Sequence, residues 1–250
     1  VINSGIIELI GGAGAIKSAG MYAEIGGSAT GTTTLENKKS ILVGQEKSAG
    51  IYIKNSADIS KGIAKNTDHP NGVINLNAGE TVGILVDNAK GINESVINVN
   101  KGNSAGMFGN NGSEITNKEK INVLHENSAG MYTVDSNATN TVNGVITITG
   151  STGATTGSAG MFGKLSGATG YKTLNEGIIN LNSITKNVGI YGEVDAVATG
   201  VLTLENNKEI NINLGSSSSV GIIAENNSGS SSNLLVNNTA NGIITGDEGS

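Results

Sequence analysis

The sequence predicts an all-β fold, a right-handed parallel β-helix of about eight to nine coils with three short strands per coil. A five-residue motif returns along the whole chain, and its copies lie 23 to 33 residues apart. Short runs rich in Ile, Val and Leu stand before and after each copy. Repeats of this length are typical of units that stack into a solenoid, and three strands with three corners fit one coil.

The motif begins the series as Ser18-Ala19-Gly20-Met21-Tyr22. Its central residue is always glycine, at Gly20, Gly50, Gly83, Gly106, Gly130, Gly160, Gly189 and Gly221. Strand alternation predicts that the Ala or Val before the glycine and the Met or Ile after it both face the interior. The glycine between them would let the next coil approach closely.

A second strand precedes each motif, as in Gly72-Val73-Ile74-Asn75-Leu76. In four copies its Ile lies nine residues before the motif glycine, which indicates two sides of one coil. Its polar position is occupied by Asn75, Asn98, Asn122, Asn180 and Asn211, with Thr147 in step. We expect either a ladder of amides that bond from coil to coil or a solvated face open to sugars.

A third, weaker strand follows each motif, at residues 34–36, 58–59, 91–93, 114–116, 141–143, 173–175, 203–205 and 234–236. An asparagine stands at or just after most of these runs: Asn37, Asn93, Asn117, Asn143, Asn175, Asn206 and Asn237. Asparagine tolerates the left-handed conformation better than most residues, so we expect these residues to form sharp corners.

Other repeat architectures fit less well. A propeller blade needs about 40 residues and four antiparallel strands. Helical repeats need a 3.6-residue period, which no window here keeps between its Gly and Asn residues. The right-handed form is expected for parallel strands joined by crossovers. Residues 1–250 show no internal domain boundary, and both ends fall within a coil without a capping element, so we expect a segment of a longer rod.

Composition excludes several classes of partner. The net charge is −6, and the 15 basic residues are all Lys and form no patch, so nucleic acid is a poor candidate. No run of about 18 apolar residues is present to span a membrane. With no Cys, the chain cannot form a disulfide or a thiolate metal site.

No catalytic constellation is apparent, so we predict a protein that is not an enzyme and has no catalytic residues, metal or cofactor. The carboxylates do not gather in register; Glu36 and Glu205 share a column but lie several coils apart. His69 and His125 lack the spacing of paired metal ligands. Some β-helices are polysaccharide lyases or hydrolases, so a carbohydrate-active enzyme remains the alternative.

The last position of the motif is aromatic in six copies: Tyr22, Tyr52, Phe108, Tyr132, Phe162 and Tyr191. Strict alternation places this stripe on the outside, where exposed apolar residues mark an interaction surface. The alternative is a structural role, in which a bend at the glycine turns the rings inward or the rings stack and close the coil face.

The repeated N-x-G-x-I-x-[LV] followed by [SN]-[AV]-G-[MI]-[YF] resembles the β-helical passenger domain of type V bacterial autotransporters. The Asn- and Lys-rich, Arg-free composition is similar to that of the large fusobacterial outer-membrane autotransporter adhesins. The resemblance covers the whole chain. It implies a stalk on the bacterial cell surface, anchored to the outer membrane by a C-terminal barrel that is not in this chain. It also implies adhesion to a host or bacterial surface protein or a glycan, or, alternatively, a purely mechanical spacer.

Overall fold

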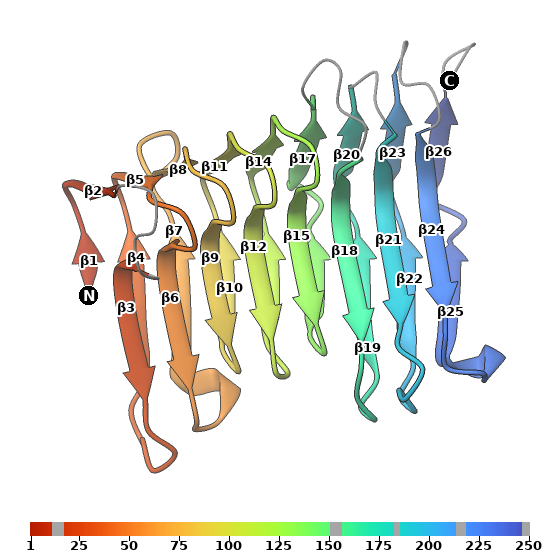
Figure 1. Ribbon diagram of the computed structural model, residues 1–250, viewed down its shortest axis with the longest axis horizontal. Helices are drawn as coiled ribbons and strands as arrows, with labels where there is room; N and C mark the ends of the chain where they lie inside the picture. The colour runs from red at the N-terminus through yellow and green to blue at the C-terminus, as the bar shows by residue number, and fades with distance from the viewer. Residues whose placement is uncertain (12–17, 151–156, 183–185, 214–218, 247–250) are drawn as a thin grey trace.

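The computed structural model describes residues 1–11, 18–150, 157–182, 186–213 and 219–246. These residues form a right-handed parallel β-helix, as predicted (Figure 1). The chain visits three sheets in turn, so every third strand joins the same sheet and each strand pairs in parallel with its equivalents in the adjacent coils.

Sheet A contains the strand that follows each motif. Its strands are β1 (Ile2–Asn3), β4 (Thr33–Asn37), β7 (Gly62–Asn66), β10 (Lys90–Asn93), β13 (Glu114–Asn117), β16 (Asn137–Asn140), β19 (Tyr171–Asn175), β22 (Leu202–Asn206) and β25 (Leu234–Asn238). Two short 3-10 turns, Ile59–Lys61 and Ser231–Asn233, precede β7 and β25.

Sheet B contains the Ile-rich strand that precedes each motif. Its strands are β2 (Ile6–Ile10), β5 (Ser40–Gly44), β8 (Val73–Leu76), β11 (Val96–Val99), β14 (Lys120–Val123), β17 (Val145–Ile148), β20 (Ile178–Leu181), β23 (Glu209–Ile212) and β26 (Ile243–Gly246).

Sheet C contains the motif itself. Its strands are β3 (Ala19–Ile25), β6 (Ala49–Asn55), β9 (Val82–Asp87), β12 (Ala105–Asn110), β15 (Ala129–Val134), β18 (Ala159–Leu165), β21 (Val188–Val194) and β24 (Val220–Asn226). Because equivalent strands pair without slippage, each motif position forms a straight column along the rod.

The core is a continuous column of apolar side chains inside the coils. Ile97 and Ile121 of sheet B are fully buried, as are Met107 and Met131 of sheet C. The predicted interior position of the Met/Ile column is therefore confirmed. Three of its four unbranched methionines occupy the coils between Ile84 and Ile190, and Met21 stands in the first coil; such a flexible side chain adapts to uneven neighbours.

A buried ladder of asparagines runs along the end of sheet A. Each side-chain amide donates to the side-chain oxygen of the next coil at 2.8 to 3.0 Å. The members are Asn3, Asn37, Asn66, Asn93, Asn117, Asn140, Asn175, Asn206 and Asn238. Five of these amides also donate to the backbone carbonyl two residues on, as Asn117 does to Glu119 at 3.0 Å, so the ladder satisfies polar groups of those corners.

This ladder corrects the predicted third strand in three ways. Residues 58–59 and 141–143 lie outside sheet A, whose strands there are β7 and β16. Asn143 is exposed in a turn and Asn237 is one residue away from the ladder position. The ladder residues end strands rather than adopt the left-handed conformation, which Asn88, Asn103, Asn111 and Asn127 adopt instead.

The predicted amide ladder on sheet B is present in two segments. Asn98 donates to Asn75 and Asn122 donates to Asn98, both at 2.8 Å, and Asn211 donates to Asn180 at 3.0 Å. Thr147 stands between the two segments in register. These residues are half-buried on the outer face, so this ladder also borders solvent.

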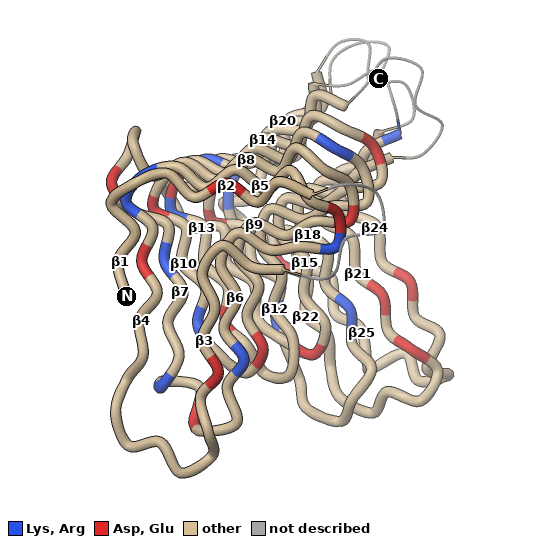
Figure 2. Tube along the Cα trace, turned by 60° about the vertical axis from the view of Figure 1, so that its left-hand side comes forward, with Lys and Arg blue, Asp and Glu red and all other residues tan. Residues whose placement is uncertain are grey.

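Charged residues are dispersed over the coils, with Lys and acidic residues interspersed (Figure 2). Many pair across neighbouring coils, as Lys118 does with Glu94 at 2.8 Å and Lys90 does with Glu114 at 2.9 Å. Among the described residues, no helix is long and apolar enough to cross a membrane.

Candidate functional site

The aromatic stripe lies on the outer face of sheet C. Tyr22 is 51% exposed, and the other five rings are half-buried, whereas the residues on either side of each ring in β6, β12 and β15 are buried. Strict alternation therefore holds from the Met/Ile column onward, and the rings do not turn into the core.

The rings also stack on one another from coil to coil. Centroids are 5.0 Å apart for Phe108 and Tyr132, 4.8 Å for Tyr132 and Phe162, and 4.7 Å for Phe162 and Tyr191. Tyr22 and Tyr52 form a separate pair at 5.2 Å, because Leu85 interrupts the stripe between Tyr52 and Phe108. The rings of the stripe therefore face outward and also pack against one another.

The motif glycines allow the coils to approach closely, as predicted. They also face the interior, which strand alternation did not predict. A Cβ at Gly106 would lie 2.7 Å from the carbonyl oxygen of Gly130 and 2.8 Å from the Cγ2 atom of Ile121. The same relation repeats at Gly83, Gly130 and Gly160. Any side chain at these positions would clash with backbone as well as with the core.

The Ala/Val column before the glycine faces outward, which contradicts the predicted interior position. Ala105 and Ala129 line the outer groove beside the aromatic rings and are not part of the buried apolar cluster. The reason is that both Gly106 and Met107 point inward, so the strand breaks its alternation at the glycine. The alanines are only 6% and 7% exposed because they form the floor of that groove.

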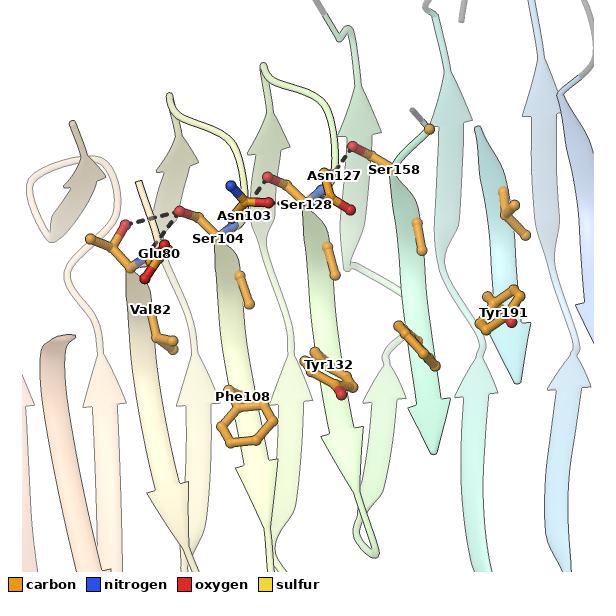
Figure 3. A pocket seen from close by; sticks show the side chains of 17 residues that line it. Glu80, Val82, Asn103, Ser104, Phe108, Asn127, Ser128, Tyr132, Ser158 and Tyr191 are labelled. Carbon is orange, nitrogen blue, oxygen red and sulfur yellow. Dashed lines mark hydrogen bonds between the residues drawn. The ribbon is translucent and has the colours of Figure 1, made fainter. Parts of the chain in front are cut away.

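The groove runs along the rod over β9, β12, β15, β18 and β21 and has a volume of about 620 Å³ (Figure 3). The Ala/Val column forms its floor, and the rings of Phe108, Tyr132, Phe162 and Tyr191 form one wall. A second groove of about 710 Å³ continues it over β3, β6 and β9, past Leu85 to Tyr52 and Tyr22. Val82 and Glu80 border both, so the two grooves form one furrow across sheet C.

The opposite wall is polar and was not predicted as part of a site. Its turn residues, Glu80, Asn103 and Asn127, all adopt the left-handed conformation with φ between 51° and 57°. Beside them the motif serines form a ladder, in which the Ser128 hydroxyl accepts from the Ser104 backbone N–H at 3.3 Å and Ser158 accepts from Ser128 at 3.1 Å. The recurring [S/T/N] before the alanine is the sequence signal for this wall.

Charged side chains form ion pairs on the far side of the aromatic stripe, near the two ends of the furrow. Lys54 pairs with Glu24 at 3.0 Å, and Lys164 pairs with Asp195 at 2.9 Å and Glu193 at 3.0 Å. Those two carboxylates raise the pKa of Lys164, which stays protonated. In the coils between them the equivalent positions are Asp87, which is charged, and Asn110 and Val134, which are not.

The environment of the rings shifts their acidity. Burial raises the pKa of Tyr132 above its ordinary value. Burial, and then a hydrogen bond to Glu225, raises the pKa of Tyr191 to about 12. These phenols therefore remain neutral donors at physiological pH.

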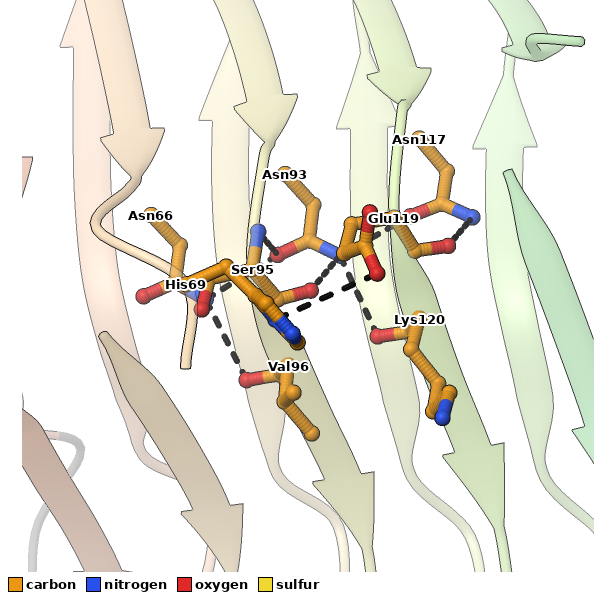
Figure 4. Close-up of polar contacts among 8 residues, drawn as sticks. All are labelled: Asn66, His69, Asn93, Ser95, Val96, Asn117, Glu119 and Lys120. Atoms are coloured by element: carbon orange, nitrogen blue, oxygen red, sulfur yellow. Dashed lines mark hydrogen bonds and ion pairs between the residues drawn. The ribbon is translucent and has the colours of Figure 1, made fainter. Parts of the chain in front are cut away.

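Neither histidine lines the furrow. His69 Nδ1 lies 3.9 Å from a carboxylate oxygen of Glu119, across the corner where Asn66, Asn93 and Asn117 of the ladder meet (Figure 4). His125 lies 3.6 Å from Glu126. Within the described part of the chain, no three His, Cys, Asp or Glu residues are grouped as metal ligands.

The paired acids singled out from the sequence are far apart. Glu36 and Glu205 occupy the same column of sheet A but lie six coils apart. The residues between them in this column are Lys65, Ile92, Thr116, Thr139 and Leu174. At about 4.8 Å per coil that is roughly 29 Å, whereas glycoside hydrolysis needs carboxyls within about 5–10 Å.

Neither the models of known protein families, nor characterised proteins, nor solved structures show a match to this chain. The class is therefore defined by the fold itself, a parallel β-helix with an aromatic-lined furrow along one sheet.

Proposed function

We propose that this chain is a non-catalytic adhesin segment of a bacterial autotransporter passenger, displayed on the cell surface, and that the furrow over sheet C contacts its partner. The observation that carries the proposal is the outward stripe of rings beside an open groove. A stripe needed only for the core would be buried, whereas exposed aromatic surface is typical of interaction sites.

The rest of the rod supports a role in display. Two amide ladders and a serine ladder join successive coils, and the serine ladder holds the polar wall of the groove by repeating hydrogen bonds. Because the furrow lies on a rigid sheet, its residues lose little conformational entropy when a partner binds.

Binding of the purified chain to bacterial and epithelial cells tests the proposal. The variant with Tyr52, Tyr132 and Tyr191 all changed to Ser should keep its circular dichroism spectrum and lose cell binding. The matched control changes Tyr171, which lies on sheet A outside the furrow, to Ser. Adhesion by the folded triple variant equal to that of the unaltered chain would leave the stripe a structural element. No measurable binding by the unaltered chain would instead make this segment a mechanical spacer.

A further inference from the structure

The central groove is uncharged although the surface around it is not. Among the described residues that line it, Glu80 at one end is the single one with a carboxylate or ammonium group. The ion pairs Lys54–Glu24 and Lys164–Asp195 stand beyond the rings, outside this lining. An anionic or cationic ligand would lose hydration here without gaining a countercharge, so the groove favours a neutral ligand.

The two walls offer different chemistry to that ligand. One wall carries aromatic rings, and Figure 3, which looks onto the groove, shows the ring of Phe108 face-on. The other carries the exposed amides of Asn103 and Asn127 above the serine hydroxyls. Ring faces attract weakly positive C–H groups, and amides both donate and accept hydrogen bonds. A sugar ring presents C–H groups on its faces and hydroxyls at its edge.

The spacing of the groove distinguishes a sugar chain from a peptide. Successive rings from Phe108 to Tyr191 are 4.7 to 5.0 Å apart. An extended chain of equatorially linked pyranoses advances by nearly the same distance per sugar. An extended peptide advances about 3.3 Å per residue, so its side chains would fall out of step with the rings within two coils.

Together these observations deepen the proposed function, on which the following statement rests. We infer that the central groove binds an unbranched, uncharged chain of pyranose sugars, which lies along the rod axis with one sugar per coil beside Phe108, Tyr132, Phe162 and Tyr191. The alanine floor leaves room for the sugar rings, and the exposed amides of Asn103 and Asn127 meet their hydroxyls.

The test is calorimetric titration of the whole chain with neutral β-linked oligosaccharides of glucose, galactose, mannose and N-acetylglucosamine, each from two to six sugars long. At least one series should bind, with affinity that rises up to about four sugars and then levels off, because four rings line the groove. Tyr132→Ser should lower that affinity about tenfold. Tyr171→Ser, on sheet A outside the furrow, should leave it unchanged.

Three results would overturn the inference: no binding in any neutral series at millimolar concentration, affinity independent of chain length, or tighter binding of oligogalacturonate than of the neutral chains. Cell adhesion separates this outcome from the proposed function. Adhesion that depends on the stripe but resists competition by every neutral oligosaccharide would retain the adhesin and reject the sugar. Adhesion that does not depend on the stripe would reject the furrow as the contact surface, and with it the part of the proposed function on which the sugar inference rests.

Discussion

The ring of Tyr132 stacks on the ring of Phe162, with centroids 4.8 Å apart and planes inclined by 25°. The two residues are 30 positions apart in sequence but occupy the same position of adjacent motifs. Each ring is therefore held by its neighbour before any partner arrives. Such preorganisation lowers the entropic cost of binding at the groove beside it.

Because adjacent coils approach closely at the motif glycines, we predict that adding one methyl group at such a glycine strongly destabilises the fold. Gly106→Ala would place Cβ 2.7 Å from the Gly130 carbonyl oxygen, and backbone cannot yield as a flexible side chain does. We expect a loss of about 3 kcal/mol or more in the free energy of unfolding, measured by urea denaturation. Gly26→Ala is the control, because a Cβ there meets nothing within 4 Å, and its unfolding should change by less than about 0.5 kcal/mol. Equal effects of the two substitutions would contradict the packing described.

From the buried ladder we predict that an asparagine stabilises the rod when its side chain bonds to those of adjacent coils, and not when it lies in an exposed turn. Asn117 is fully buried, donates to Asn140 and accepts from Asn93, both at 2.8 Å. Asn117→Ala leaves the neighbouring amides without those partners and should cost about 2–4 kcal/mol. Asn143→Ala, in an exposed turn 26 residues on, should cost less than about 0.5 kcal/mol by the same urea measurement. A stable Asn117→Ala variant would show that the ladder contributes nothing to folding.

The sequence predicts the architecture because the strands are regularly spaced in most coils. The prediction of individual ladder residues fails in the coils where a longer turn changes this spacing. In six of nine coils a ladder asparagine stands four residues before the sheet B isoleucine, as Asn93 does before Ile97. The turns after Asn66, Asn140 and Asn238 are longer, so those members were missed. An N-x-x-x-I pattern with permitted insertions would find them.

The aromatic stripe was predictable, but the floor of its groove was not. Alternation correctly places Tyr132 outside because the strand is regular from Met131 onward. It fails one step earlier, where Gly130 and Met131 both face the core and Ala129 is turned outward. A glycine has no side chain, so the apolar and polar pattern of the sequence does not show which way it faces. The outward orientation of the alanine before it is therefore seen only in the structure.

The raised phenol pKa of Tyr191 predicts how the rod responds to alkali. A phenol whose pKa is about 12 in the folded chain and about 10 when unfolded favours folding fully below pH 10, and that contribution is lost as the pH rises toward 12. Absorbance at the phenolate band should show its last titration step near pH 12, and Tyr191→Phe should remove this step. Persistence of the step in the variant would assign the raised pKa to another residue.

The most direct test of the furrow as the partner-binding surface fills its floor without touching a ring or a ladder. Ala129→Leu adds an isobutyl side chain to the centre of the groove, and the matched control Val142→Leu adds bulk at an exposed turn outside it. Cell binding should fall about tenfold or more for Ala129→Leu and stay unchanged for Val142→Leu, with both chains folded by circular dichroism. Full adhesion by the folded Ala129→Leu chain would contradict the account.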